Sequence, residues 1–100
     1  MPTFNTEVPH QLGMEQATQR LKQFVEQVRE QYKDFVTDLQ GNWTDNRLSF
    51  SFKTYGFQID GTLTVDETAA RLAGNLPFAA LVFRGKIEQS ITTELRRELS

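Results

Sequence analysis

The stretch that decides the fold runs from Trp43 to Leu76 and reads WTDNRLSFSFKTYGFQIDGTLTVDETAARLAGNL. Apolar and polar residues alternate along it in three runs, which begin at Leu48, Phe57 and Ala70. This period of two is typical of strands with one face buried and the other exposed to water. The stretch therefore predicts half-buried antiparallel strands.

Three two-residue turns, at 45–46, 55–56 and 66–67, would join these runs into a four-stranded meander. Each turn keeps the apolar residues of neighbouring strands on one face, whereas a slip of one residue would move a whole strand to the other face. The predicted cross-strand pairs are Trp43 with Leu48, Phe52 with Ile59, Phe50 with Gly61, Leu63 with Ala70, and Gly61 with Leu72. A glycine on the inner face permits a sharp bend, so we expect the sheet to curve at Gly61.

Two helical patterns flank the meander. Apolar residues recur every three or four positions from Glu15 to Leu39, which predicts a long amphipathic helix with Gly41 just beyond its end. Pro77 opens a second helix that continues to about Leu99. Its predicted core-facing stripe consists of Ala80, Phe83, Ile87, Ile91, Leu95 and Leu99.

The segment from Thr3 to Val8 adds a fifth strand at a sheet edge. The expected fold is therefore one α+β domain over residues 1–100, in the order β-α-β-β-β-β-α. Both helices should cover the same face of the sheet, because an amphipathic helix must bury its apolar stripe.

Composition excludes several classes of function. The chain has 100 residues, a net charge of −2 and no cysteine. Its longest basic run is Arg96-Arg97, which is too short to predict nucleic-acid binding. The longest near-apolar stretch, residues 76–83, is far shorter than the ~20 residues of a membrane span, and residues 1–7 do not resemble a signal peptide. We therefore expect a cytoplasmic protein with no membrane span and no nucleic-acid partner.

Catalytic and metal sites are not predicted. His10 is the only histidine, and no serine or aspartate beside it in the sequence suggests a catalytic pair. A metal site needs several ligands, and no glycine-rich phosphate loop is present. The sequence predicts a structural role for His10, no enzyme activity, no cofactor and no bound metal.

The start of the second helix is unusual because it is apolar on every side. Phe78 and Val82 fall outside the core-facing stripe, and Leu81 lies at its border. Two interpretations remain open: this end is completely buried, or it forms an exposed apolar patch. A patch of this kind on a protein surface marks an interaction site, and Phe78, Leu81 and Val82 are its candidate residues.

Several short motifs resemble one family in their order and spacing. The motifs are His10-Gln11-Leu12, Trp43 ahead of Leu48-Ser49-Phe50, Gly56, Gly61 with Leu63-Thr64-Val65, Leu76-Pro77-Phe78, and Ile87-Glu88. Together they resemble the polyhydroxyalkanoic acid system proteins, over about residues 5 to 99. These are small bacterial proteins whose genes occur near polyester-storage genes. The resemblance implies a cytoplasmic protein linked to polyhydroxyalkanoate granules, and it implies no known reaction.

Two functions follow as hypotheses. The first is a non-enzymatic granule-associated or regulatory protein, whose apolar patch contacts the polyester surface, a granule protein or a second copy in a homodimer. The alternative is a small hydrophobic-ligand-binding domain of helix-grip type, by analogy with Bet v 1-like folds. We expect aromatic side chains to fill any space between the helices and the sheet, which favours the first hypothesis.

Overall fold

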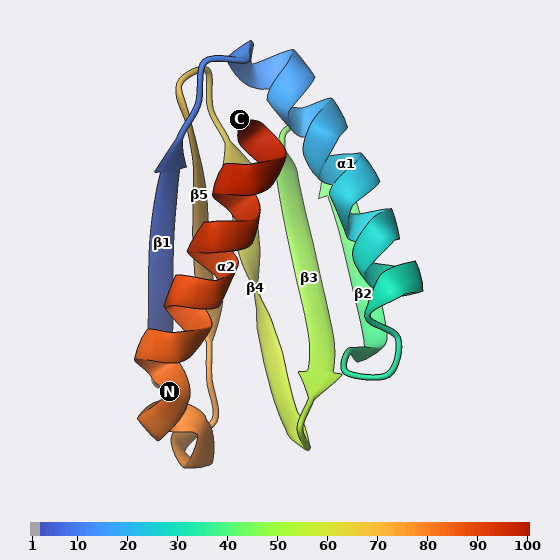
Figure 1. Ribbon diagram of the computed structural model, residues 1–100, viewed down its shortest axis with the longest axis vertical. Helices are drawn as coiled ribbons and strands as arrows, with labels where there is room; N and C mark the ends of the chain where they lie inside the picture. Colours follow the sequence, from blue (N-terminus) through green and yellow to red (C-terminus); the bar gives the residue numbers. More distant parts are fainter. Residues whose placement is uncertain (1–2) are drawn as a thin grey trace.

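The computed structural model describes residues 3–100, so the first two residues of the predicted domain lie outside the described part (Figure 1). Five strands and two α-helices follow one another in the predicted order, with a 3₁₀ helix before the last α-helix. The elements are β1 (Thr3–Pro9), α1 (Gly13–Gln31), β2 (Thr37–Thr44), β3 (Arg47–Thr54), β4 (Phe57–Val65), β5 (Ala69–Asn75), η1 (Phe78–Phe83) and α2 (Arg84–Leu99).

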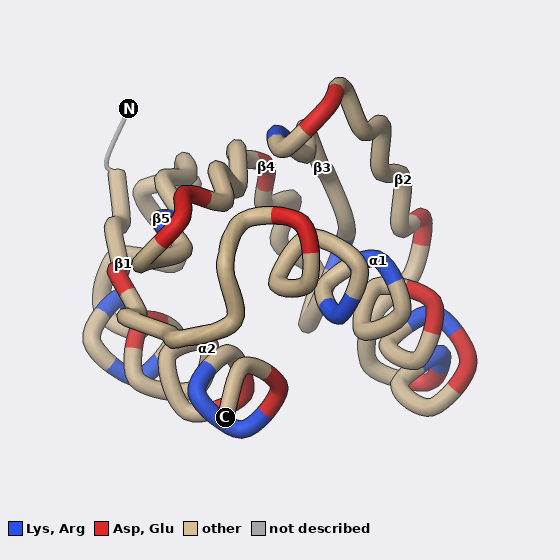
Figure 2. Tube along the Cα trace, turned by 90° about the horizontal axis from the view of Figure 1, so that it is seen from above, with Lys and Arg blue, Asp and Glu red and all other residues tan. Residues whose placement is uncertain are grey.

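The five strands form one antiparallel sheet in the order β1-β5-β4-β3-β2. The edge position predicted for the first strand is confirmed, because β1 pairs with β5 alone. Both helices lie on the same side of the curved sheet, with α2 over the β1 side and α1 over the β2 side (Figures 1 and 2). Both helices carry basic and acidic residues along their length (Figure 2).

The predicted register is confirmed in the first two hairpins and wrong in the third. Phe50 does pair with Gly61, but Gly61 pairs with Gly74 on its other side, and Leu63 pairs with Leu72. The third turn therefore lies at 67–68, one residue beyond the predicted 66–67, which shifts the pairing of β4 with β5 by two residues. A shift of two residues keeps every side chain on its predicted face.

A tertiary contact fixes the position of this third turn. The backbone N–H of His10 donates to the carbonyl of Thr68 at 2.9 Å, and the His10 ring lies 2.9 Å from the carbonyl of Asp66. Asp66 in turn donates its backbone N–H to Ala69. His10, which directly follows β1, thus hydrogen-bonds the turn. The residues of the turn alone do not predict this contact.

The first helix ends eight residues earlier than predicted, at Gln31. The Tyr32 carbonyl accepts hydrogen bonds from the backbone N–H groups of both Phe35 and Val36, so the chain turns sharply there. From Thr37 the backbone is a strand, and Gly41 lies inside β2 rather than after a helix. The spacing of the apolar residues from 32 to 39 fits a helix, but it also fits a turn followed by a strand.

The second helical segment begins as a 3₁₀ helix, η1, before it becomes α2 at Arg84. With three residues per turn, side chains three apart lie above one another. Phe78 and Leu81 therefore share one ridge, which is exposed, and Ala80 is buried. Phe83 was predicted as core but is 49% exposed, and one side of its ring packs against Phe57, with ring centroids 6.4 Å apart.

The core lies between the inner face of the sheet and the two helices. Its buried apolar residues are Phe4, Val8, Ala17, Leu21, Leu48, Ile59, Leu63, Val65, Ala70, Leu72, Leu76, Ala80, Leu95 and Leu99. Ile87 and Ile91 of the predicted stripe are only partly buried against this core. Within α2, burial is therefore complete only toward the C-terminal end, at Leu95 and Leu99, and this pattern positions the site described next.

Candidate functional site

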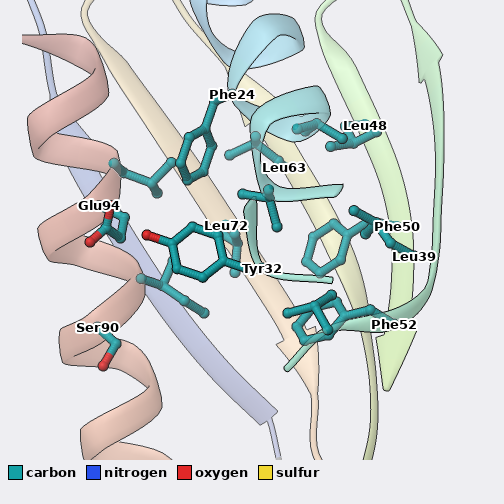
Figure 3. A pocket seen from close by; sticks show the side chains of 15 residues that line it. Phe24, Tyr32, Leu39, Leu48, Phe50, Phe52, Leu63, Leu72, Ser90 and Glu94 are labelled. Atoms are coloured by element: carbon teal, nitrogen blue, oxygen red, sulfur yellow. The ribbon is translucent and has the colours of Figure 1, made fainter. Parts of the chain in front are cut away.

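An open apolar groove separates the two helices above the sheet. It has a volume of about 290 Å³, and all of its exposed lining is apolar. One wall comes from the second half of α1 and the turn after it, the other wall from α2, and the floor from four strands (Figure 3). The lining residues are Phe24, Val25, Val28, Tyr32, Val36, Leu39, Leu48, Phe50, Phe52, Leu63, Leu72, Ser90, Ile91, Glu94 and Leu95.

The groove exists because the helices are held together at one end only. The Arg20 guanidinium of α1 donates hydrogen bonds to the carbonyls of Glu98 and Ser100, at 3.3 and 2.8 Å. Farther along, the Thr92 hydroxyl of α2 pairs with the Thr6 hydroxyl of β1, so α2 follows that edge of the sheet. The helices therefore diverge (Figure 1), and the groove stays open between them above the sheet.

The aromatic side chains beneath the groove do not fill it, so the expectation of a filled space is wrong. Phe50 and Phe52 stack side by side on the sheet with ring centroids 6.1 Å apart. They form part of the floor and leave the volume above them open (Figure 3). Figure 3 also shows the Tyr32 ring reaching across from the end of α1, with its hydroxyl directed toward Glu94.

A second feature is a concentration of exposed apolar side chains at one end of the molecule. Of the eight large hydrophobic residues that are exposed among those described, only Met14 lies elsewhere. The others come from the turn after α1, the β3–β4 turn and η1, all near the lower end of Figure 1. We call this set the apolar end; its members are Tyr32, Phe35, Tyr55, Phe78, Leu81, Val82 and Phe83.

Contacts between aromatic rings connect these segments. The rings of Phe35 and Tyr55 lie 6.4 Å apart, and those of Phe57 and Phe83 are also 6.4 Å apart. The β3–β4 hairpin thus touches the turn after α1 on one side and η1 on the other. Tyr32 belongs both to the apolar end and to the groove, so the two features are continuous.

The residues predicted as an interaction patch lie within the apolar end. Phe78 is 76% exposed, Val82 is 82% exposed and Leu81 is 41% exposed. Of the two interpretations of this helix start, the exposed patch is therefore the one that the structure shows. The sequence did not identify Phe35, which was assigned to a helix, or Tyr55, although a bulky residue in a two-residue turn is a signal of exposure.

His10 has the structural role that its sequence context predicted. Its ring is buried, accepts a hydrogen bond at Nδ1 from the backbone N–H of Leu12 and donates from Nε2 to the carbonyl of Asp66. Both ring nitrogens are thus used to connect β1, the start of α1 and the β4–β5 turn. Among residues 3–100, no three carboxylate or histidine side chains cluster in a way that could hold a metal ion.

The fold and these surfaces can now be set beside known proteins. A family model described as "Putative polyhydroxyalkanoic acid system protein" matches residues 5–99. The chain belongs to this family. The match covers β1 from Asn5 onward, both helices and every strand of the meander. Comparison with curated proteins and with solved structures found no match. In the described part of this family member, no helix is long and apolar enough to cross a membrane.

Proposed function

We propose that this chain is a non-enzymatic accessory protein of the polyhydroxyalkanoate system that attaches to polyester granules through its apolar end. Family membership supports the polyhydroxyalkanoate setting. The observation that carries the proposal is the exposure of Phe78 and Val82 beside five other large apolar side chains at one end. Large exposed apolar patches on proteins mark sites of contact with other surfaces.

The free energies of burial and of association show why several apolar residues must act together. Burying one exposed apolar side chain stabilises a complex by about 1.5–3 kcal/mol. Association costs about 4–15 kcal/mol in lost translational and rotational freedom. One exposed phenylalanine therefore cannot hold the chain on a surface, whereas the seven side chains of the apolar end supply enough when they are buried together.

The chemistry of the apolar end favours an apolar partner surface over a charged one. The polyester of a granule is such a surface, and its storage in the cytoplasm gives the chain a cytoplasmic location in this proposal. Attachment needs no catalytic group, which fits the structural use of His10. A homodimer through the same residues is the competing arrangement, because a two-fold interface would place η1 against its copy.

Co-sedimentation with polyhydroxyalkanoate particles tests the proposal. The purified chain should pellet with the particles, and the double variant Phe78→Ser/Val82→Ser should stay in the supernatant while it remains folded by circular dichroism. Met14→Ser is the matched control, because Met14 is also exposed but lies at the start of α1. Equal pelleting of all three proteins would refute attachment through the apolar end, and a monomer–dimer difference on sedimentation without particle binding would indicate the homodimer instead.

A further inference from the structure

Apart from Tyr32, no residue of the groove between α1 and α2 belongs to the apolar end. It is recessed between two helices, and its exposed lining is entirely apolar among the described residues. Apolar ligand sites in proteins are concave and lined in this way, at volumes of about 300–1,000 Å³. At about 290 Å³, the groove is at the lower limit of that range.

The shape and size of the groove select a narrow occupant. The wall on the α1 side runs from Phe24 to Tyr32, just after the helix, and these eight steps rise by about 12 Å along the helix axis. An apolar cavity of about 150 Å³ accommodates benzene, so by proportion a groove of this volume holds about a dozen carbon atoms. A helix of a second copy is about 10–12 Å wide with its side chains and is too broad for this space. An elongated volume of this size fits a single alkyl chain.

The polar groups at the groove define the head of such a ligand. Tyr32, Ser90 and Glu94 belong to the walls, and no lysine, arginine or histidine is among the lining residues. Glu94 is itself paired with Arg97, at 3.4 Å, so a carboxylate on the ligand would lose its water in the apolar groove without a free cation to pair with. The Tyr32 hydroxyl, which points across the groove toward Glu94, can hydrogen-bond an uncharged ester or hydroxyl group (Figure 3).

We propose that the groove binds one uncharged hydroxyalkanoate ester whose acyl chain has about ten to twelve carbons in all. The hydrocarbon would lie over Phe50, Phe52 and Leu63, and the ester head would lie beside Tyr32. The choice of a hydroxyalkanoate rests on the proposed polyester setting, whereas the chain length and the neutral head rest on the groove alone. In this proposal the protein binds single ester molecules in its groove and attaches to the granule surface through its apolar end.

Calorimetric titration with methyl 3-hydroxyalkanoates of four to fourteen carbons tests this inference. The dissociation constant should fall about fourfold for each added CH₂, which corresponds to about 0.8 kcal/mol, and it should level off near twelve carbons. The 3-hydroxydecanoate anion should bind about fivefold more weakly than its methyl ester, because its charge would be desolvated without a cation among the lining residues. An affinity that does not depend on chain length, or tighter binding of the anion, would overturn the proposal.

Val28→Phe supplies the matched structural test. Val28 lines the groove, so the added ring atoms occupy the space of the alkyl chain, and the ten-carbon ester should bind at least about tenfold more weakly. Val82→Phe makes the same change at an exposed position outside the groove and should bind the ester as the original chain does. Circular dichroism checks that both variants are folded, and wild-type affinity in Val28→Phe would refute the site.

Failure of this inference can be distinguished from failure of the proposed function. Phe78→Ser/Val82→Ser changes the apolar end and leaves the described groove lining intact. That variant should lose particle binding and keep its affinity for the ten-carbon ester. If the double variant loses its affinity for the ester while Val28→Phe binds the ester normally, the ester site lies at the apolar end. That result would contradict the groove assignment.

Discussion

Gly61 and Gly74 lie directly opposite each other in β4 and β5, at the centre of the sheet's inner face. Phe50 pairs with Gly61 on one side, and Phe4 pairs with Gly74 on the other. A side-chain carbon at Gly61 would lie 2.5 Å from the Ala73 carbonyl oxygen and 2.9 Å from the Phe50 ring, and one at Gly74 would collide with the Phe4 ring. The two glycines thus leave room for the rings from the flanking strands, and the curved sheet can close around its core (Figure 2).

Gly61→Val should destabilise the protein by about 1–3 kcal/mol through overpacking. The upper end of that range is expected, because the nearest atoms belong to the backbone of β5 and cannot rotate away. Urea unfolding midpoints measure the effect. Gly85→Ala is the matched control: no atom lies within 4 Å of the added carbon, and the helix should gain about 0.5–1 kcal/mol. An unchanged midpoint for Gly61→Val would show that the sheet is not closely packed there.

Leu95→Ala should cost about 2–5 kcal/mol, because Leu95 is only 2% exposed where α2 meets the core. Ile87→Ala, eight residues earlier on the same helix, should cost less, about 1–2 kcal/mol, since part of its side chain is already exposed. Denaturant unfolding of both variants gives the comparison. Equal losses would mean that the first half of α2 is packed as tightly as the second half.

His10→Ala should cost about 1–3 kcal/mol, because the removal of the ring leaves the Asp66 carbonyl and the Leu12 N–H without their partners. His10→Gln should retain part of this stability, since its amide can still donate to Asp66. Hydrogen exchange at the Leu12 amide reports the local effect. Unchanged exchange in the alanine variant would contradict the structural role assigned to the ring.

Much of the fold could be predicted because one face of the sheet is buried. Alternation along residues 48–76 and two-residue turns at 45–46 and 55–56 were enough to fix the register of two hairpins. The third hairpin depends on the hydrogen bonds from His10 to its turn, which join segments far apart in the sequence. The first helix was predicted too long because the chain turns at Tyr32, whose carbonyl accepts two backbone hydrogen bonds. The apolar residues after this turn still have helical spacing.

The candidate site was predictable only in part. The exposure of Phe78 and Val82 could be read from their position outside the core-facing stripe, although the segment proved to be a 3₁₀ helix. The groove could not be predicted, because it depends on how far α1 and α2 diverge. That divergence follows from Arg20 holding the helices together at one end and Thr92 holding α2 at the edge of the sheet.

The central claim is that the apolar end attaches the chain to polyester granules, and the most direct measurement is fluorescence imaging in polyester-accumulating cells. A fluorescent fusion of the original chain should concentrate on the granules, and Met14→Ser should do the same. Phe78→Ser/Val82→Ser should be spread evenly through the cytoplasm at equal abundance, because two of the most exposed apolar side chains are gone while the core is unchanged. Granule localisation of the double variant at the original level would contradict the claim.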